Sequence, residues 1–146
     1  MGPVRLRKIQ GDRLAAGPRR DRLVAIADGI DQLIRAHRPA SLAPDRLYFN
    51  KNVRTAMVVS EARGIALLCA ARAALEIAEY TPSEVKLAVT GSGSADKRQV
   101  QRMLSLVLRL DHRIIGDNVA DAVAIALTHA QRSRFAGAVR LAEAGA

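Results

Sequence analysis

The sequence has no tryptophan, only two tyrosines and two phenylalanines, and a single cysteine among its 146 residues. This shortage of aromatic rings argues against a protein that holds single-stranded nucleic acid by stacking the bases. The lone Cys69 cannot form a disulfide within the chain, which favours a reducing, cytoplasmic compartment. No apolar run reaches the roughly 18 residues of a spanning helix and no signal peptide opens the sequence, so no membrane partner is expected.

Acidic residues are also outnumbered. Fourteen Asp and Glu stand against 23 Lys and Arg, which gives a formal net charge of +9 and an isoelectric point near 11.0. A solvated basic face is one explanation, but an excess of this size in a small protein favours a polyanionic partner, above all nucleic acid. The length fits a single domain over residues 1–146 with an ordinary hydrophobic core.

Helical periodicity and turn signals alternate along the chain, with short strands between the helices. Thr81-Pro82-Ser83-Glu84 is a capping box with proline in the first turn, and Gly91-Ser92-Gly93 breaks the helix that it begins. Helices are expected over residues 18–38, 52–75, 82–88, 95–108 and 119–134. A strand followed by a loop is expected over 41–49, a strand over 76–80, a loop over 111–117, and irregular or frayed ends over 1–17 and after 134.

Three motifs follow one another between Asp45 and His129. They read D-R-L-Y-F-N-K-N-V-R-T-A-M, then E-Y-T-P-S-E-V-K-L-A-V-T-G-S-G-S-A-D-K-R-Q-V-Q-R-M, then N-V-A-D-A-V-A-I-A-L-T-H. In this order and at this spacing, over roughly residues 18–130, they resemble the RuvC Holliday-junction resolvases of the RNase H-like nuclease superfamily. The resemblance implies an α/β fold, with a mixed sheet flanked by helices.

One family element is not found in the 146 residues. RuvC proteins open with a strand that carries the sequence I-D-P-G and the first catalytic aspartate, and no segment here matches it. The resemblance therefore implies a sheet that is truncated at its N-terminal side. Because that strand is central in the family, its absence removes hydrogen-bonding partners from its neighbours.

The resemblance also implies a metal site. RNase H-like nucleases cleave phosphodiesters with two divalent cations held by carboxylates, and Mg²⁺ is the natural ion for such oxygen ligands. The matching residues are Asp45, where the family usually has Glu, Asp121, and Asn118, where the family has Asp or His. Asn118 brings no charge and equally fits a helix N-cap, whereas neighbouring Asp117 is a possible substitute, one position out of register.

A second group of residues matches the DNA-binding positions of the family. Lys86 and Lys97 match lysines that contact phosphates near the cut, and Tyr48 matches the aromatic residue inserted at the centre of the junction. The Gly91–Ser94 turn suits close approach of a backbone to DNA, although such turns are often only helix breakers. Further basic and polar groups beside Tyr48 are Lys51, Asn52 and Arg54.

The expected function is that of a crossover junction endodeoxyribonuclease, which resolves Holliday junctions in recombination and repair. By the same resemblance it acts on four-way junction DNA as a homodimer, through the helix over 52–75, together with a branch-migration helicase complex. One alternative is a catalytically defective protein that binds branched DNA without cutting it, and another is a basic helical protein that binds RNA. The remaining candidate, His129, is expected to pack or to interact with a helix dipole rather than to catalyse.

Overall fold

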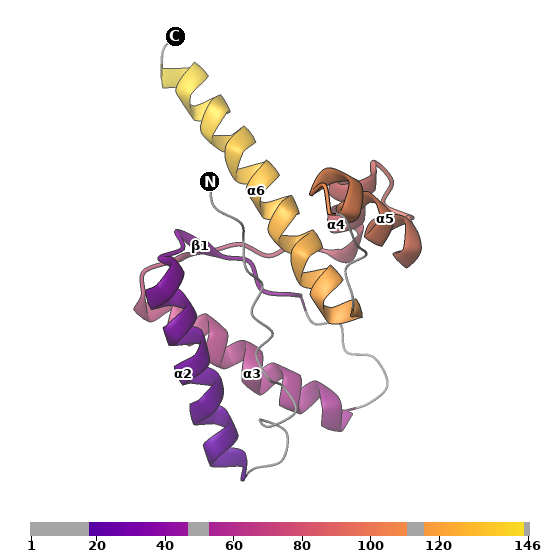
Figure 1. Cartoon of the computed structure of the whole chain (residues 1–146). Helices are drawn as coiled ribbons and strands as arrows, with labels where there is room; N and C mark the ends of the chain where they lie inside the picture. Colours follow the sequence, from indigo (N-terminus) through magenta and orange to yellow (C-terminus); the bar gives the residue numbers. More distant parts are fainter. Residues whose placement is uncertain (1–17, 47–52, 111–115, 145–146) are drawn as a thin grey trace. The chain divides into compact units, whose positions relative to one another are not determined.

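The computed structural model describes residues 18–46, 53–110 and 116–144, and the chain divides into two compact units. The first unit contains α2 (Arg19–His37), β1 (Ser41–Leu42), α3 (Val53–Arg72) and β2 (Glu76–Ile77) (Figure 1). The second contains residues 43–46 together with α4 (Pro82–Thr90), α5 (Lys97–Val107) and α6 (Asp117–Ala144). A single domain over the whole chain stays a prediction.

Helices α2 and α3 pack against each other in the first unit (Figure 1). Arg19 and Arg22 at the start of α2 form ion pairs with Glu61 of α3. The thiol of Cys69 is buried against α2, with its sulfur 3.9 Å from the carbonyl oxygen of Ala27. Burial raises the pKa of the Cys69 thiol, and the neighbouring Asp31 carboxylate raises it further, so the cysteine is a packed thiol rather than a reactive one.

The strands of the first unit are parallel and shorter than the sequence predicts. Ser41 pairs with Glu76, and Leu42 pairs with Ile77. The strand expected to begin at Ser41 ends at Leu42, because Pro44, which has no N–H, cannot extend the ladder. The expected strand over 76–80 ends at Ile77, shortly before the capping box begins α4. The α/β class is confirmed, with a small parallel sheet in the described part of the chain.

In the second unit, two capping boxes determine where α4 and α5 begin. The Thr81 side chain accepts a hydrogen bond from the N–H of Glu84, as predicted, and Glu84 accepts one from the N–H of Thr81. Asp96 and Gln99 make the same reciprocal pair at the start of α5. Because Asp96 is a cap, α5 begins two residues after the predicted start at residue 95.

The core of the second unit brings together its helices. Val85 and Val89 of α4, Leu104 of α5, and Ala120, Ala124 and Ile125 of α6 form one buried cluster. Leu104 has no exposed surface, and the small alanines let the other helices approach α6 closely. Ala43 also packs against this cluster, so the segment after β1 belongs to the same core.

Helix α6 differs most from its predicted bounds. The sequence predicts an end near residue 134 and a frayed tail, whereas the helix continues to Ala144. Alanine-rich sequence has high helix propensity, and this outweighs the single Gly137. None of the helices in the described ranges has an apolar stretch long enough to cross a membrane.

Candidate functional site

The first two turns of α6 carry two of the expected metal-site residues. Asn118 and Asp121 are three residues apart and therefore lie on the same face of the helix, and both are exposed. The helix already includes Asn118, while the carbonyl oxygen of Gly116 accepts the hydrogen bond from the N–H of Ala120, 3.1 Å away. The N-cap alternative for Asn118 therefore does not fit this boundary.

The third expected ligand, Asp45, is exposed and belongs to the same unit as α6. Ala43, two residues earlier, packs against the core cluster that includes Ala120, the residue before Asp121. The core thus connects the Asp45 segment with the start of α6. Within residues 18–46, 53–110 and 116–144, no three His, Cys, Asp or Glu residues form a group able to hold a metal ion. The metal role of Asp45, Asp121 and Asn118 stays a prediction, and the side chain of Asp117 lies outside the described part.

The two predicted phosphate-binding lysines flank the turn between α4 and α5. Lys86 is half-buried on α4, and Lys97 is the exposed first residue of α5. The turn between them begins at Gly91, whose φ of 79° is left-handed and whose N–H donates to the carbonyl oxygen of Leu87 at 2.8 Å. Gly93 comes so close to α4 that an added Cβ would lie 2.7 Å from the Ser83 hydroxyl oxygen, so a larger residue here would push the turn away.

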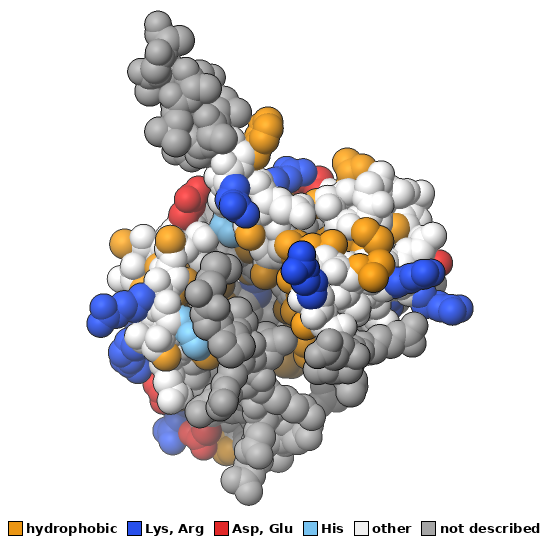
Figure 2. All heavy atoms as spheres, turned by 45° about the horizontal axis from the view of Figure 1, so that its top comes forward, with side chains coloured by type: hydrophobic (Ala, Val, Ile, Leu, Met, Phe, Trp, Pro, Cys, Tyr) orange, Lys and Arg blue, Asp and Glu red, His pale blue; other side chains and the backbone are white. Residues whose placement is uncertain are grey.

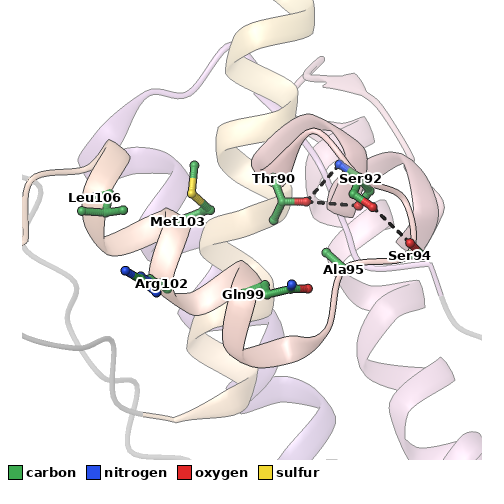
Figure 3. A pocket seen from close by; sticks show the side chains of 8 residues that line it. All are labelled: Thr90, Ser92, Ser94, Ala95, Gln99, Arg102, Met103 and Leu106. Carbon is green, nitrogen blue, oxygen red and sulfur yellow. Dashed lines mark hydrogen bonds between the residues drawn. The ribbon is translucent and has the colours of Figure 1, made fainter.

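The Thr90 hydroxyl fixes the conformation of this turn. It donates a hydrogen bond to the carbonyl oxygen of Lys86 at 2.8 Å and accepts one from the N–H of Ser92 at 3.1 Å. The hydroxyl oxygens of Ser92 and Ser94 are 3.1 Å apart, so the turn is hydrogen-bonded along its length (Figure 3). The lysines therefore flank an ordered turn with exposed hydroxyl groups at Ser92 and Ser94.

A polar network joins α4 to α6 and accounts for His129. The Tyr80 hydroxyl lies 2.8 Å from His129 Nδ1, and the Arg132 guanidinium lies 5.3 Å from the centre of the Tyr80 ring. Arg132 also pairs with Glu84 at 3.1 Å. The backbone hydrogen bond from Thr81, and then its hydroxyl, hold the pKa of Glu84 below its usual value, and Arg132 adds to the effect.

The packing role predicted for His129 fits this network. The idea that its ring interacts with a helix dipole at the helix end is wrong, because α6 continues to Ala144. Tyr48, Lys51 and Asn52 lie outside the described residues, and Arg54 lies in the first turn of α3.

The sequence-based prediction missed one feature of this region, the hollow beside the turn, which is lined by Gln99, Arg102, Met103 and Leu106 of α5. Their spacing of three, four and seven residues is a signal for a shared helix face. The spacing alone does not predict that the Gly91–Ser94 turn lies opposite this face of α5.

The comparisons with known proteins agree with these motifs. A family model, "Crossover junction endodeoxyribonuclease RuvC", matches residues 6–129. A protein of that name from Rubrobacter xylanophilus is 50% identical over 122 residues, which cover 83% of this chain and 66% of that protein. Another from Desulforamulus reducens is 46% identical over 120 residues, which cover 82% of this chain and 74% of that protein.

Solved structures agree as well. The RuvC structure from Thermus thermophilus matches with a TM-score of 0.75 at 32% identity, covering 82% of this chain and 72% of that one. The T. thermophilus RuvC in complex with Holliday junction substrate matches with a TM-score of 0.77, also at 32% identity, covering 82% and 73%. The chain spans about two thirds of the length of the R. xylanophilus protein. It belongs to the RuvC family of crossover junction endodeoxyribonucleases.

Proposed function

We propose that this chain binds four-way junction DNA and forms the catalytic core of a Holliday-junction endonuclease. The main support is the packing of Ala43 against the core that also holds Ala120, because it puts Asp45 and Asp121 in one folded unit. The same unit carries Lys86, Lys97 and the ordered turn between them. The proposal implies that the partner is DNA and that the site of action is the cytoplasm.

The chemistry of the expected ligands fits Mg²⁺. Asp45, Asp121 and Asn118 all present oxygen atoms, which hard divalent cations prefer, and all three side chains are exposed. When bound, Mg²⁺ would activate a water molecule and stabilise the leaving oxygen of the phosphodiester. The chain's own contribution is to hold these oxygens beside the DNA while the lysines bind the flanking phosphates.

We expect Lys86→Ala and Lys97→Ala each to weaken junction binding and to lower its dependence on salt. A lysine at a phosphate displaces a condensed counterion, so each loss should reduce the slope of log K against log salt by about one. The measurement is fluorescence anisotropy of a labelled four-way junction at several salt concentrations.

The matched control for both lysines is Arg35→Ala, which removes one exposed cation from α2 in the other unit. For this variant, the slope of log K against log salt should equal that of the unmutated chain. If neither lysine variant changes affinity or slope, the proposed DNA surface is in the wrong place.

A homodimer through α3 is the second part of the proposal. Met57 and Leu68 are 60% and 50% exposed, and with Gly64 they lie on one stripe of the helix. No atom lies within 4 Å of a Cβ built on Gly64, so a second backbone has room to approach there. Two copies related by two-fold symmetry would each cut one strand of a two-fold symmetric junction.

Leu68→Glu tests this dimer, because it would bury a carboxylate in the contact without disturbing the fold of the subunit. We expect the dimer dissociation constant to rise at least about tenfold, or about 1.4 kcal/mol, in sedimentation equilibrium. Leu33→Glu on α2, where the leucine is also exposed, should leave it unchanged. An unmutated, folded chain that sediments as a monomer would exclude the dimer.

We also propose that the chain cooperates with a branch-migration helicase complex, on the strength of family membership. The rival proposal, a protein that binds branched DNA without cutting it, rests on Asn118, where the family carries an ionisable residue. Scission of a junction by the chain fused to a segment with the family's I-D-P-G strand separates these two proposals.

A further inference from the structure

An open hollow of about 560 Å³ lies in the second unit, between the turn after α4 and one face of α5 (Figure 3). Its volume is within the roughly 300–1,000 Å³ of ordinary small-molecule sites. Four residues of α5 at helical spacing line it: Gln99, Arg102, Met103 and Leu106. At a rise of about 1.5 Å per residue, Gln99 and Leu106 are about 10 Å apart along the helix, so the hollow suits an elongated ligand rather than a single small ion.

The hollow shares Ser92 and Ser94 with the turn of the lysine site described above, but neither Lys86 nor Lys97 lines it. Lys97 and Leu106 are nine residues apart on α5, which at about 100° per residue places them on opposite sides of the helix. The hollow therefore faces away from Lys97. A nucleic-acid ligand in the hollow would therefore be a different segment from the one whose phosphate contacts Lys97.

The lining of the hollow presents hydrogen-bond donors from two sides. Ser92 and Ser94 contribute hydroxyl groups on one side, and Arg102 contributes an exposed guanidinium on the other (Figure 3). The amide oxygen of Gln99 already accepts from the N–H of Asp96 at 2.8 Å, so its amide NH₂ is the group left for a ligand. Among the described residues that line the hollow there is no carboxylate, so the hollow favours an anion.

The side that carries Arg102 also presents apolar surface. Met103 is half-buried and packs against the core, whereas Leu106 is 62% exposed. Figure 3 shows Met103 and Leu106 on one side of the hollow and the two serines on the other. Figure 2 shows the same combination more widely, with exposed hydrophobic side chains next to Lys and Arg on the face in view. A ligand with a phosphate and an adjoining flat or apolar group matches this combination of Arg102 with Met103 and Leu106.

We propose that this hollow binds a short unpaired DNA segment, with a phosphate at Arg102 and a base against Met103 and Leu106. An unpaired strand is required because both faces of a base in a duplex are stacked on neighbouring bases, so the face cannot pack against a protein side chain. The inference rests on the proposed function, since it adds a second strand contact to the same junction. At a four-way junction, the strands separate where the arms meet, and a site there favours branched over linear DNA.

The test measures binding of fluorescein-labelled hexathymidylate and of a four-way junction by the 146-residue chain and three variants. Arg102→Gln should weaken hexathymidylate binding about tenfold, or about 1.4 kcal/mol, because it removes a charged donor to the phosphate. Leu106→Ser should weaken it about threefold. Arg98→Gln is the matched control: it removes an exposed cation from the same helix that does not line the hollow, and affinity should change less than twofold.

The outcomes separate this inference from the function on which it rests. If the unmutated chain binds both DNAs and neither Arg102→Gln nor Leu106→Ser changes the affinity, the inference is wrong and junction binding stands. If the unmutated chain binds neither DNA, both fail. A hexapeptide of alternating Asp and Leu serves as a competitor. If it binds in an Arg102-dependent way while hexathymidylate does not, the hollow is a protein-docking site and the inference is overturned.

Discussion

Leu104→Ala should lower the free energy of unfolding of the second unit by about 3–5 kcal/mol, the range for deleting a fully buried leucine side chain. Leu104 has no exposed surface and lies among the valines of α4 and the alanines of α6. Those alanines have no rotatable side chains with which to fill the cavity. Because the total free energy of unfolding of a native protein is about 5–15 kcal/mol, this one substitution removes a large part of the stability.

Urea denaturation followed by circular dichroism measures the effect. Leu87→Ala is the matched control, since Leu87 lies on α4 and is 54% exposed, and it should cost less than about 1 kcal/mol. Similar losses in the two variants would mean that Leu104 is not central to the core. A large loss at Leu104 should also weaken junction binding, because the turn and both lysines belong to this unit.

The features that the sequence predicted well are those decided by near neighbours in the chain. The capping box at Thr81 and Glu84 needs only a side chain and a backbone amide three residues apart, and the structure contains it. The same local chemistry at Asp96 and Gln99 was overlooked, although D-x-x-Q after a glycine turn is the same kind of signal. Elements of this kind are predictable because no distant part of the chain can change them.

Features that depend on distant segments were predicted less well. A strand is only as long as its partner allows, and β1 and β2 pair over two residues each, far fewer than their β-forming sequences suggest. The assignment of Asp45 and Asp121 to one metal site was predicted only from a family resemblance, because their separation along the chain predicts no contact. The hollow was not predicted at all, since it exists only where the Gly91–Ser94 turn lies opposite one face of α5.

The largest effect concerns strand scission. In the presence of Mg²⁺, the 146-residue chain should bind a four-way junction and yet cleave it poorly. Two divalent cations about 3.5–4 Å apart repel each other strongly and need several negative ligands around them. Asp121 and Asp45 are the charged ligands that the resemblance assigns, whereas Asn118 is neutral and the I-D-P-G element with its aspartate is not among these residues. Two carboxylates are too few to hold both ions.

Supplying the absent ligands should therefore restore cutting. Fusing a segment with the family's I-D-P-G strand before Met1 should raise the rate by at least about a hundredfold, because an acidic ligand and its strand return together. Asn118→Asp in the fused protein should raise it further, since Asn118 and Asp121 lie on the same face of α6 and the added charge lies beside the metal ligand. The measurement is the rate of scission of a labelled synthetic junction in magnesium, with Asp121→Asn as the inactive control in each background. Rapid magnesium-dependent cutting by the 146-residue chain, abolished by Asp121→Asn, would show that another acid, such as Asp117, already completes the site.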